Sequence, residues 1–104
     1  MKYKYKYKRN DIVMIKPYFL KLITKFIHRS GSVDYNYINT INENCNPRFS
    51  YDQISSNSKF KIIVGNTITT NEYTYLYYRL RKIPDITNAD IYLPEIILEK
   101  MYEA

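Results

Sequence analysis

The chain has 104 residues, 45% of them apolar and 25% charged, which suits one domain with one hydrophobic core and excludes full disorder. The formal net charge of +6 favours a polyanionic or acidic partner. A single cysteine excludes an intramolecular disulfide, and the lack of an apolar run of about 18 residues excludes a membrane-spanning helix.

The positive charge is concentrated at the amino-terminal end. Residues 1–30 carry nine Lys and Arg against one Asp, whereas residues 31–104 carry seven Lys and Arg against nine acidic residues. Codon bias toward A and T explains the abundance of Ile, Tyr, Lys and Asn, as in AT-rich viruses and phages, but it does not explain this asymmetry. The asymmetry indicates a local electrostatic footprint.

Residues 1–9 are predicted to form a basic arm or an edge strand. Successive side chains of an extended backbone point to opposite faces, so three tyrosines share one face and four lysines share the other. In one interpretation, the lysines neutralise phosphates and the tyrosines stack on bases. In the other, the tyrosines pack on the core while the lysines face water and deter edge aggregation.

The next segment changes from strand to helix. Asp11–Lys16 is short, β-branched and apolar, which predicts a buried strand that ends at Pro17. Residues 17–29 have apolar side chains at helical spacing and predict an inserted helix that covers one end of the core. A pair of strands and a helix on a membrane surface are the alternatives. The basic side chains on the polar side of this helix are Lys21, Lys25 and Arg29.

Two more polar segments follow. Residues 32–42 alternate loosely and could form a strand, and residues 42–58 are rich in Asn and Ser and predict a long polar loop. We expect Phe49, Tyr51 and Ile54 to attach this loop to the body of the domain. A loop of this length in a small domain is either functional or mobile.

Two longer strands are predicted in the second half of the chain. Lys59–Thr70 carries a turn or bulge at Gly65-Asn66, and Tyr73–Leu80 alternates most clearly. Arg79 and Arg81 would extend the basic surface of the amino-terminal segment if the two patches meet.

The carboxyl-terminal end combines a short strand with a helical turn. Ile91–Leu93 is apolar and predicts the strand. Pro94 suits the first turn of a short helix, and Glu95 suits the positive end of the helix dipole.

Two motifs resemble small SH3-like and Tudor-like β-barrels. Asn10–Pro17 is similar to their first strand, often written Gly-Asp-hydrophobic-Val-x-Ile-x. Leu93–Glu99 is similar to the short turn and last strand that seal such barrels. Phe60–Ile68 and Tyr73–Leu80 would then form the central hairpin, so that the resemblance covers roughly half of the chain.

The resemblance implies a mainly β fold, either a small SH3-like barrel or a curled antiparallel sheet, with one inserted helix and a short C-terminal helical turn. Asn10 stands where the family usually has Gly, and Asn tolerates the same left-handed conformation. Residues 17–57 are much longer than the family's first loop. Such barrels bind peptides, nucleic acids or other subunits and few are enzymes, so the resemblance implies a binding function.

The sequence contains no pattern of catalytic residues. His28 lies on the polar side of the predicted helix without a nucleophile, and Cys45 lies in the polar loop without an activating base. A metal-dependent nuclease with Asp85, Asp90 and Glu95 as ligands is a third alternative. We expect no enzyme, no cofactor and no metal.

The sequence therefore predicts a non-enzymatic structural or adaptor protein of a large particle, such as a virion or nucleoprotein assembly, that binds other protein subunits. The alternative is a free-standing nucleic-acid-binding module, regulatory or ribosome-like, whose partner is DNA or RNA. The expected location is intracellular or within a virion. The residues predicted to contact nucleic acid or an acidic partner are Lys2, Tyr3, Lys4, Tyr5, Lys6, Tyr7, Lys8, Arg9, Lys21, Lys25, Arg29, Arg79 and Arg81.

Overall fold

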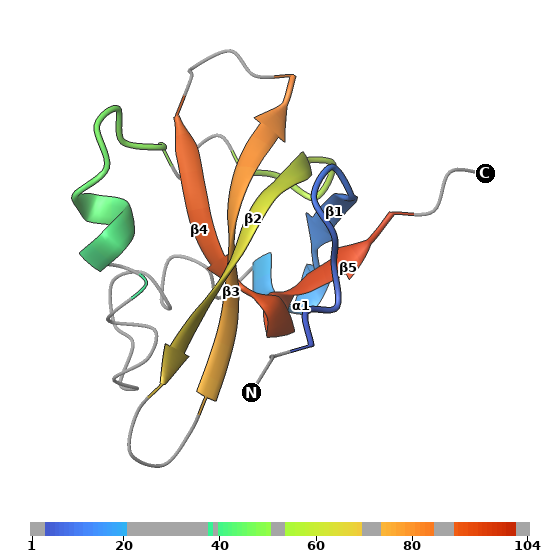
Figure 1. Cartoon of the computed structure of the whole chain (residues 1–104). Coiled ribbons are helices and arrows are strands. Elements are labelled where there is room, and N and C mark those ends of the chain that lie inside the picture. Colours follow the sequence, from blue (N-terminus) through green and yellow to red (C-terminus); the bar gives the residue numbers. More distant parts are fainter. Residues whose placement is uncertain are drawn as a thin grey trace.

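The computed structural model describes residues 4–20, 38, 40–50, 54–69, 74–84 and 89–101, and within them the fold is mainly β, as predicted (Figure 1). Five antiparallel strands form one sheet in the order β4-β3-β2-β1-β5. The strands are β1 (Ile12–Ile15), β2 (Lys59–Thr69), β3 (Thr74–Ile83), β4 (Asp90–Pro94) and β5 (Leu98–Lys100). Short helices include α1 (Pro17–Leu20) and the 3-10 helix η2 (Glu95–Ile97).

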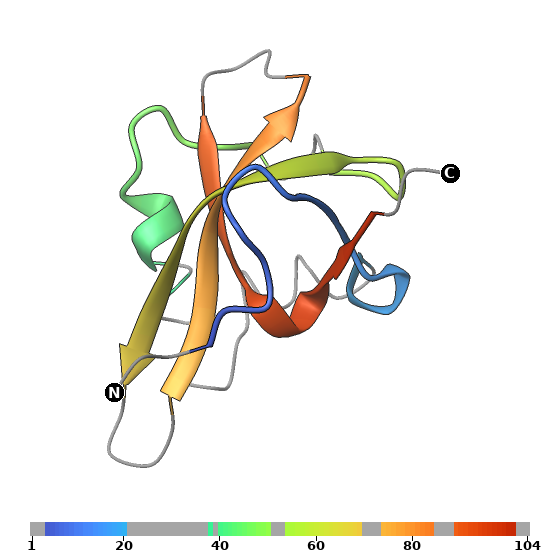
Figure 2. The ribbon, with the colours of Figure 1, turned by 45° about the vertical axis from the view of Figure 1, so that its right-hand side comes forward.

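β2 and β3 are the long central strands, and they cross the molecule side by side (Figures 1 and 2). Their pairing runs from Lys59 opposite Ile83 to Thr69 opposite Thr74, with a register shift between Ile62 and Val64. The prediction of a bulge or turn at Gly65-Asn66 is therefore wrong. Gly65 lies within the paired strand, where it serves a close contact described below.

β1 confirms the strand predicted at residues 11–16 and its end before Pro17, which begins α1. Val13 and Ile15 are buried and Ile12 and Met14 are half-buried, as the alternation of a strand requires. β1 pairs with β2 on one side and with β5 on the other. The first and last of the described strands are therefore neighbours.

A tight turn and a bulge precede β1. The Asp11 amide donates to the Lys8 carbonyl (3.0 Å), and Asn10, the third residue of this turn, has a φ of 73°. Asn10 and Asp11 together oppose Ile62: the Asn10 amide donates to the Ile62 carbonyl (2.8 Å), and the Ile62 amide donates to the Asp11 carbonyl (2.9 Å). This is the bulge whose first residue is usually a left-handed Gly, so the expectation for Asn10 is confirmed.

The core lies on the inner face of the curled sheet. Phe60 and Tyr78 are its largest fully buried side chains. Phe49 joins it from the predicted polar loop, with its ring centroid 6.3 Å from that of Phe60, which confirms that this residue attaches the loop. Ile54 packs against the core edge, and Tyr51 lies outside the described residues.

The predictions of the helices and of the polar loop are confirmed in part. Of the helix predicted at 17–29, the described part, Pro17–Leu20, is helical. Ile38 and residues 40–43 are also helical, where the alternation over 32–42 suggested a strand. Residues 44–50 and 54–58 contain no helix or strand. The short C-terminal helical turn is present as η2.

The sheet is open, because β4 and β5 lie at its two edges. Asn42 covers the edge of β4: its side-chain Nδ2 donates to the Tyr92 carbonyl (2.8 Å), and its Oδ1 accepts from the Tyr92 amide (2.7 Å). These are the two backbone groups that another strand would use, so a buried side chain blocks further pairing there. Among the described residues, no helix has the length and apolar character needed to cross a membrane.

Candidate binding surfaces

The amino-terminal segment, residues 4–10, crosses the core without forming a strand (Figure 2). Tyr7 is only 4% exposed, and its hydroxyl donates to the Leu98 carbonyl of β5 (2.8 Å). Its amide donates to the hydroxyl of Tyr78 in β3 (3.1 Å). Tyr7 therefore connects β3 to β5, and its ring is part of the core.

Tyr5 lies over β2 and β3. Its ring centroid is 5.9 Å from that of Tyr78, and its hydroxyl shares a hydrogen bond of 2.7 Å with the Thr67 hydroxyl. Tyr5 and Tyr7 thus both contact Tyr78.

Glu95 of η2 completes this contact. One carboxylate oxygen, Oε2, accepts hydrogen bonds from the Tyr78 hydroxyl (2.5 Å) and the Lys6 amide (3.0 Å). Burial, reinforced by the bond to Glu95, raises the pKa of the Tyr78 hydroxyl well above its usual value. Tyr78 therefore remains a neutral donor to Glu95 and acceptor from Tyr7 at physiological pH.

The predicted lysine face points away from the core. Lys4, Lys6 and Lys8 are exposed, and the Lys6 ammonium lies 5.6 Å from the centroid of the Tyr7 ring. The sequence allowed two interpretations of the tyrosines, stacking on bases or packing on the core. Tyr7 is packed in the core, and most of the Tyr5 side chain is packed against the sheet. Five predicted contact residues lie outside the described part of the chain: Lys2, Tyr3, Lys21, Lys25 and Arg29.

A second basic feature links this segment to β3. The turn that contains Lys8 and Arg9 is bonded to Ile62, the neighbour of Lys61 in β2. Lys61 lies directly opposite Arg81 in the register of β2 and β3, so their side chains share a face. We call the resulting surface the basic stripe; it consists of Lys8, Arg9, Lys61, Arg79 and Arg81.

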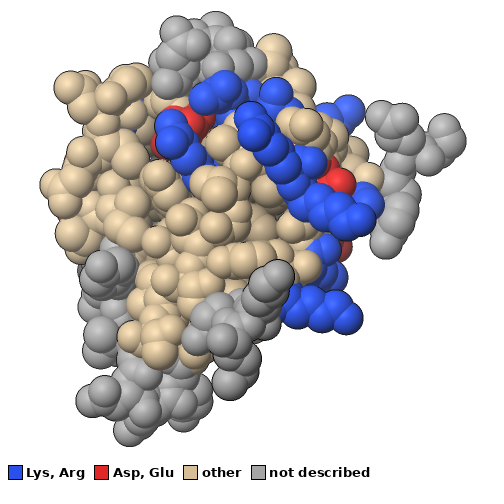
Figure 3. Space-filling model, viewed as in Figure 1, with Lys and Arg blue, Asp and Glu red and all other residues tan. Residues whose placement is uncertain are grey.

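Figure 3 shows Lys and Arg side chains gathered across the upper and right-hand part of one face of the molecule. The segments of the two predicted patches, which the sequence could not connect, both adjoin β2. Lys61 is not among the predicted contact residues. It alternates with the buried Phe60 and Ile62, which would have placed it on the outer face.

Asp90 of β4 holds the two arginines of the basic stripe. Its Oδ2 accepts from Arg79 Nε (2.6 Å), and its Oδ1 accepts from Arg81 Nε (2.9 Å). Burial by itself raises the pKa of Asp90, but the hydrogen bonds from Arg81 and Arg79 outweigh it and lower the pKa below its usual value. The bond to Asp90 in turn raises the pKa of Arg79. Both guanidinium groups are thus ionised and held in fixed orientations.

The acidic residues of the nuclease alternative serve other contacts. Asp90 binds the two arginines, Glu95 binds Tyr78 and Lys6, and Asp85 lies outside the described residues. Within the described ranges, no three His, Cys, Asp or Glu side chains come together as metal ligands would. The Cys45 thiol donates to the Ile41 carbonyl (3.2 Å).

Three comparisons with known proteins were made. The chain matches no protein-family model, no curated protein and no solved structure.

Proposed function

We propose that the protein is a non-enzymatic structural or adaptor subunit of a large particle, such as a virion or nucleoprotein assembly, and that it attaches through the basic stripe. The supporting observation is that Lys61 and Arg81 lie opposite each other on one face of the sheet, and that the turn carrying Lys8 and Arg9 is bonded to Ile62, the neighbour of Lys61. Positive side chains on adjacent elements produce a field that attracts an acidic protein or a phosphate backbone.

We also propose that the curled sheet is a variant of the SH3-like fold. The support is the pairing of β1 with β5, the consecutive β2-β3-β4 arrangement, and the single 3-10 turn between β4 and β5. Proteins with that fold bind peptides, nucleic acids or other subunits, which agrees with a binding role. The fold alone does not select among these partners.

The packing of the tyrosines favours an electrostatic mode of attachment. A base stacks on an exposed aromatic face, and the Tyr7 ring is buried while the Tyr5 ring lies against the sheet. The cations of the basic stripe do not need such stacking, because they act on charge alone. An acidic protein surface of the particle is the partner that this packing favours, because it binds without stacking on the tyrosines.

A free-standing nucleic-acid-binding module is the second candidate. The observation in its favour is the fixed orientation of Arg79 and Arg81 on Asp90. A planar guanidinium held in place is suited to phosphate oxygens. Such binding would be independent of sequence and sensitive to salt.

Two double variants test the proposal with equal loss of charge. Lys8→Gln with Lys61→Gln removes two charges from the basic stripe, and Lys4→Gln with Arg48→Gln removes two exposed charges that are not part of it. The expected result is that the wild-type chain and the second variant sediment with the native particle, whereas the first variant is released at lower salt. Sedimentation of the wild-type chain as a free monomer in the extract would overturn the structural role.

Binding to short DNA and RNA duplexes separates the two candidates. If the protein is a nucleic-acid-binding module, the first variant should reduce the magnitude of the slope of log affinity against log salt by roughly two, one for each lost phosphate contact. The second variant should keep the wild-type slope. Absence of duplex binding in low salt would eliminate this candidate and leave the protein partner.

A further inference from the structure

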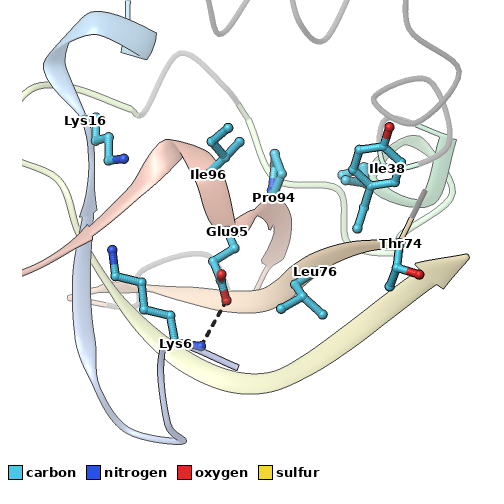
Figure 4. A pocket seen from close by; sticks show the side chains of 9 residues that line it. Lys6, Lys16, Ile38, Thr74, Leu76, Pro94, Glu95 and Ile96 are labelled. Carbon is cyan, nitrogen blue, oxygen red and sulfur yellow. Dashed lines mark hydrogen bonds between the residues drawn. The ribbon is translucent and has the colours of Figure 1, made fainter. Parts of the chain in front are cut away.

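A pocket of about 430 Å³ lies between the end of β1, the start of β3 and η2 (Figure 4). None of its lining residues belongs to the basic stripe. Its volume is within the range of pockets that hold organic ligands or side chains of a partner. It is therefore a separate candidate site.

One end of the pocket is apolar. Ile38, Leu76 and Pro94 line it, and Ile96 of η2 stands at its rim with 60% of its surface exposed. Ile97, the next residue of the turn, is buried, whereas Ile96 faces water. An apolar group that covers Ile96 would remove this apolar surface from water, which is favourable in free energy.

The other end of the pocket is cationic. Figure 4 shows the ammonium groups of Lys6 and Lys16 at this end, opposite Leu76 and Ile38. Within the described part of the chain, neither ammonium forms an ion pair. Glu95 also lines the pocket, but its Oε2 already accepts from the Lys6 amide and the Tyr78 hydroxyl. The pocket thus carries positive charge that its own carboxylate does not neutralise in a direct pair.

We infer that this pocket binds a short segment of a partner protein in which a Glu or Asp lies beside apolar side chains. The carboxylate contacts Lys6 and Lys16, and the apolar side chains cover Leu76, Pro94 and Ile96. A nucleic acid satisfies only the cationic end, because its phosphates gain nothing from apolar walls. The basic stripe and this pocket would give an adaptor two independent contacts.

Blocked tetrapeptides provide the probe. The first is acetyl-Leu-Ile-Leu-Glu-amide, the second has Gln in place of Glu, and octanoate is a third probe for a free amphipathic anion. Binding is followed by the amide chemical shifts of Leu76 and Ile96 in the full chain labelled with ¹⁵N. We expect the Glu peptide to bind about fivefold more tightly than the Gln peptide, the ratio that one exposed ion pair supplies.

Matched variants connect that ratio to the lysines. Lys6→Gln with Lys16→Gln should abolish the preference for Glu, while Lys4→Gln with Arg48→Gln should keep it. The stripe variant Lys8→Gln with Lys61→Gln should also keep it, so failure of the pocket and failure of the proposed function are distinguishable. Equal binding of the two peptides, binding of octanoate alone, or no binding to wild type would each overturn the inference.

Discussion

The ring of Tyr5 lies directly on Gly65. A Cβ added to Gly65 would be 2.7 Å from both Cδ1 and Cε1 of the Tyr5 ring, closer than real Cβ contacts allow. Gly65 has no positive φ, so its role is to leave room for the ring and not to turn the backbone. This contact, together with the bond to Thr67, holds the amino-terminal segment on the sheet without strand pairing.

The first prediction is that the effect of Gly65→Ala on stability has opposite signs with and without the Tyr5 ring. In the wild-type chain it should lower the free energy of unfolding by about 1–2 kcal/mol, because the Tyr5 ring must move away from Tyr78 and Thr67. In a Tyr5→Ala background it should raise stability by about 0.5–1 kcal/mol, because Ala is preferred to Gly within a strand. Denaturant unfolding of the four chains measures the coupling, and additive effects would contradict the contact.

The second prediction concerns the left-handed residue before β1. Asn10→Gly should stabilise the protein by up to about 1 kcal/mol, because Gly adopts a φ near 73° without steric cost. Asn10→Val should destabilise it by more than 1 kcal/mol, roughly the penalty for a branched side chain in this region. Asn57→Gly, at an exposed turn position without positive φ, is the matched control and should give no gain.

The third prediction tests the hydroxyl of Tyr78. Tyr78→Phe keeps the buried ring but removes the acceptor of the Tyr7 amide and a donor to Glu95, at a cost of about 1–2 kcal/mol. Hydrogen exchange of the Tyr7 and Lys6 amides should accelerate at least about tenfold as the segment opens locally. Tyr92→Phe is the control. Unchanged exchange at Tyr7 in Tyr78→Phe would show that the segment is held by other contacts.

The fourth prediction concerns acid stability. The folded protein holds the pKa of Asp90 below the ordinary value of 3.8, so the unfolded chain takes up the proton first as pH falls. The stabilisation is complete above about pH 4 and decreases below it, toward the folded pKa. Asp90→Asn should lower stability at pH 7 by about 1–2 kcal/mol and flatten this acid limb. Identical acid limbs in both chains would refute the role given to Asp90.

The fifth prediction concerns the edge of β4. Asn42→Ala removes both hydrogen bonds to the backbone of Tyr92. The Tyr92 amide and carbonyl then either lack a partner or pair with a strand of another molecule. Stability should fall by about 2 kcal/mol or more, and self-association should increase with concentration in sedimentation velocity. Asn44→Ala, at an exposed position two residues away, is the control, and its sedimentation coefficient should equal that of the wild-type chain.

Local rules were sufficient for the strands and for the turn at Asn10. A short β-branched apolar run identified β1, a cluster of apolar residues identified β2, and alternation identified β3, because a strand with one buried face has a period of two. The same rule failed at Ile38–Glu43, where Ile38 and Ile41 are also spaced as on a helix. The rule that a strand Gly marks a bulge failed at Gly65, because the reason for that Gly is a ring from a segment 60 residues away.

The candidate surfaces depended on information that is not local. Positive charge on Lys8, Arg9, Arg79 and Arg81 was evident from the sequence, but their connection through Lys61 requires the register of β2 against β3. The burial of Tyr7 likewise depends on Leu98 and Tyr78, which lie in strands near the other end of the chain. Composition suggests a basic protein; only the pairing of distant strands shows which charges are neighbours.

The bond from Tyr7 to Leu98 has a consequence for biosynthesis. The two residues are 91 positions apart, and β1 needs β5 as its second neighbour. As the chain emerges from a ribosome, Tyr7 has no place to dock until Leu98 has been translated. Formation of this sheet is therefore expected to wait for β5 and to be slow, since contacts of long sequence separation dominate it.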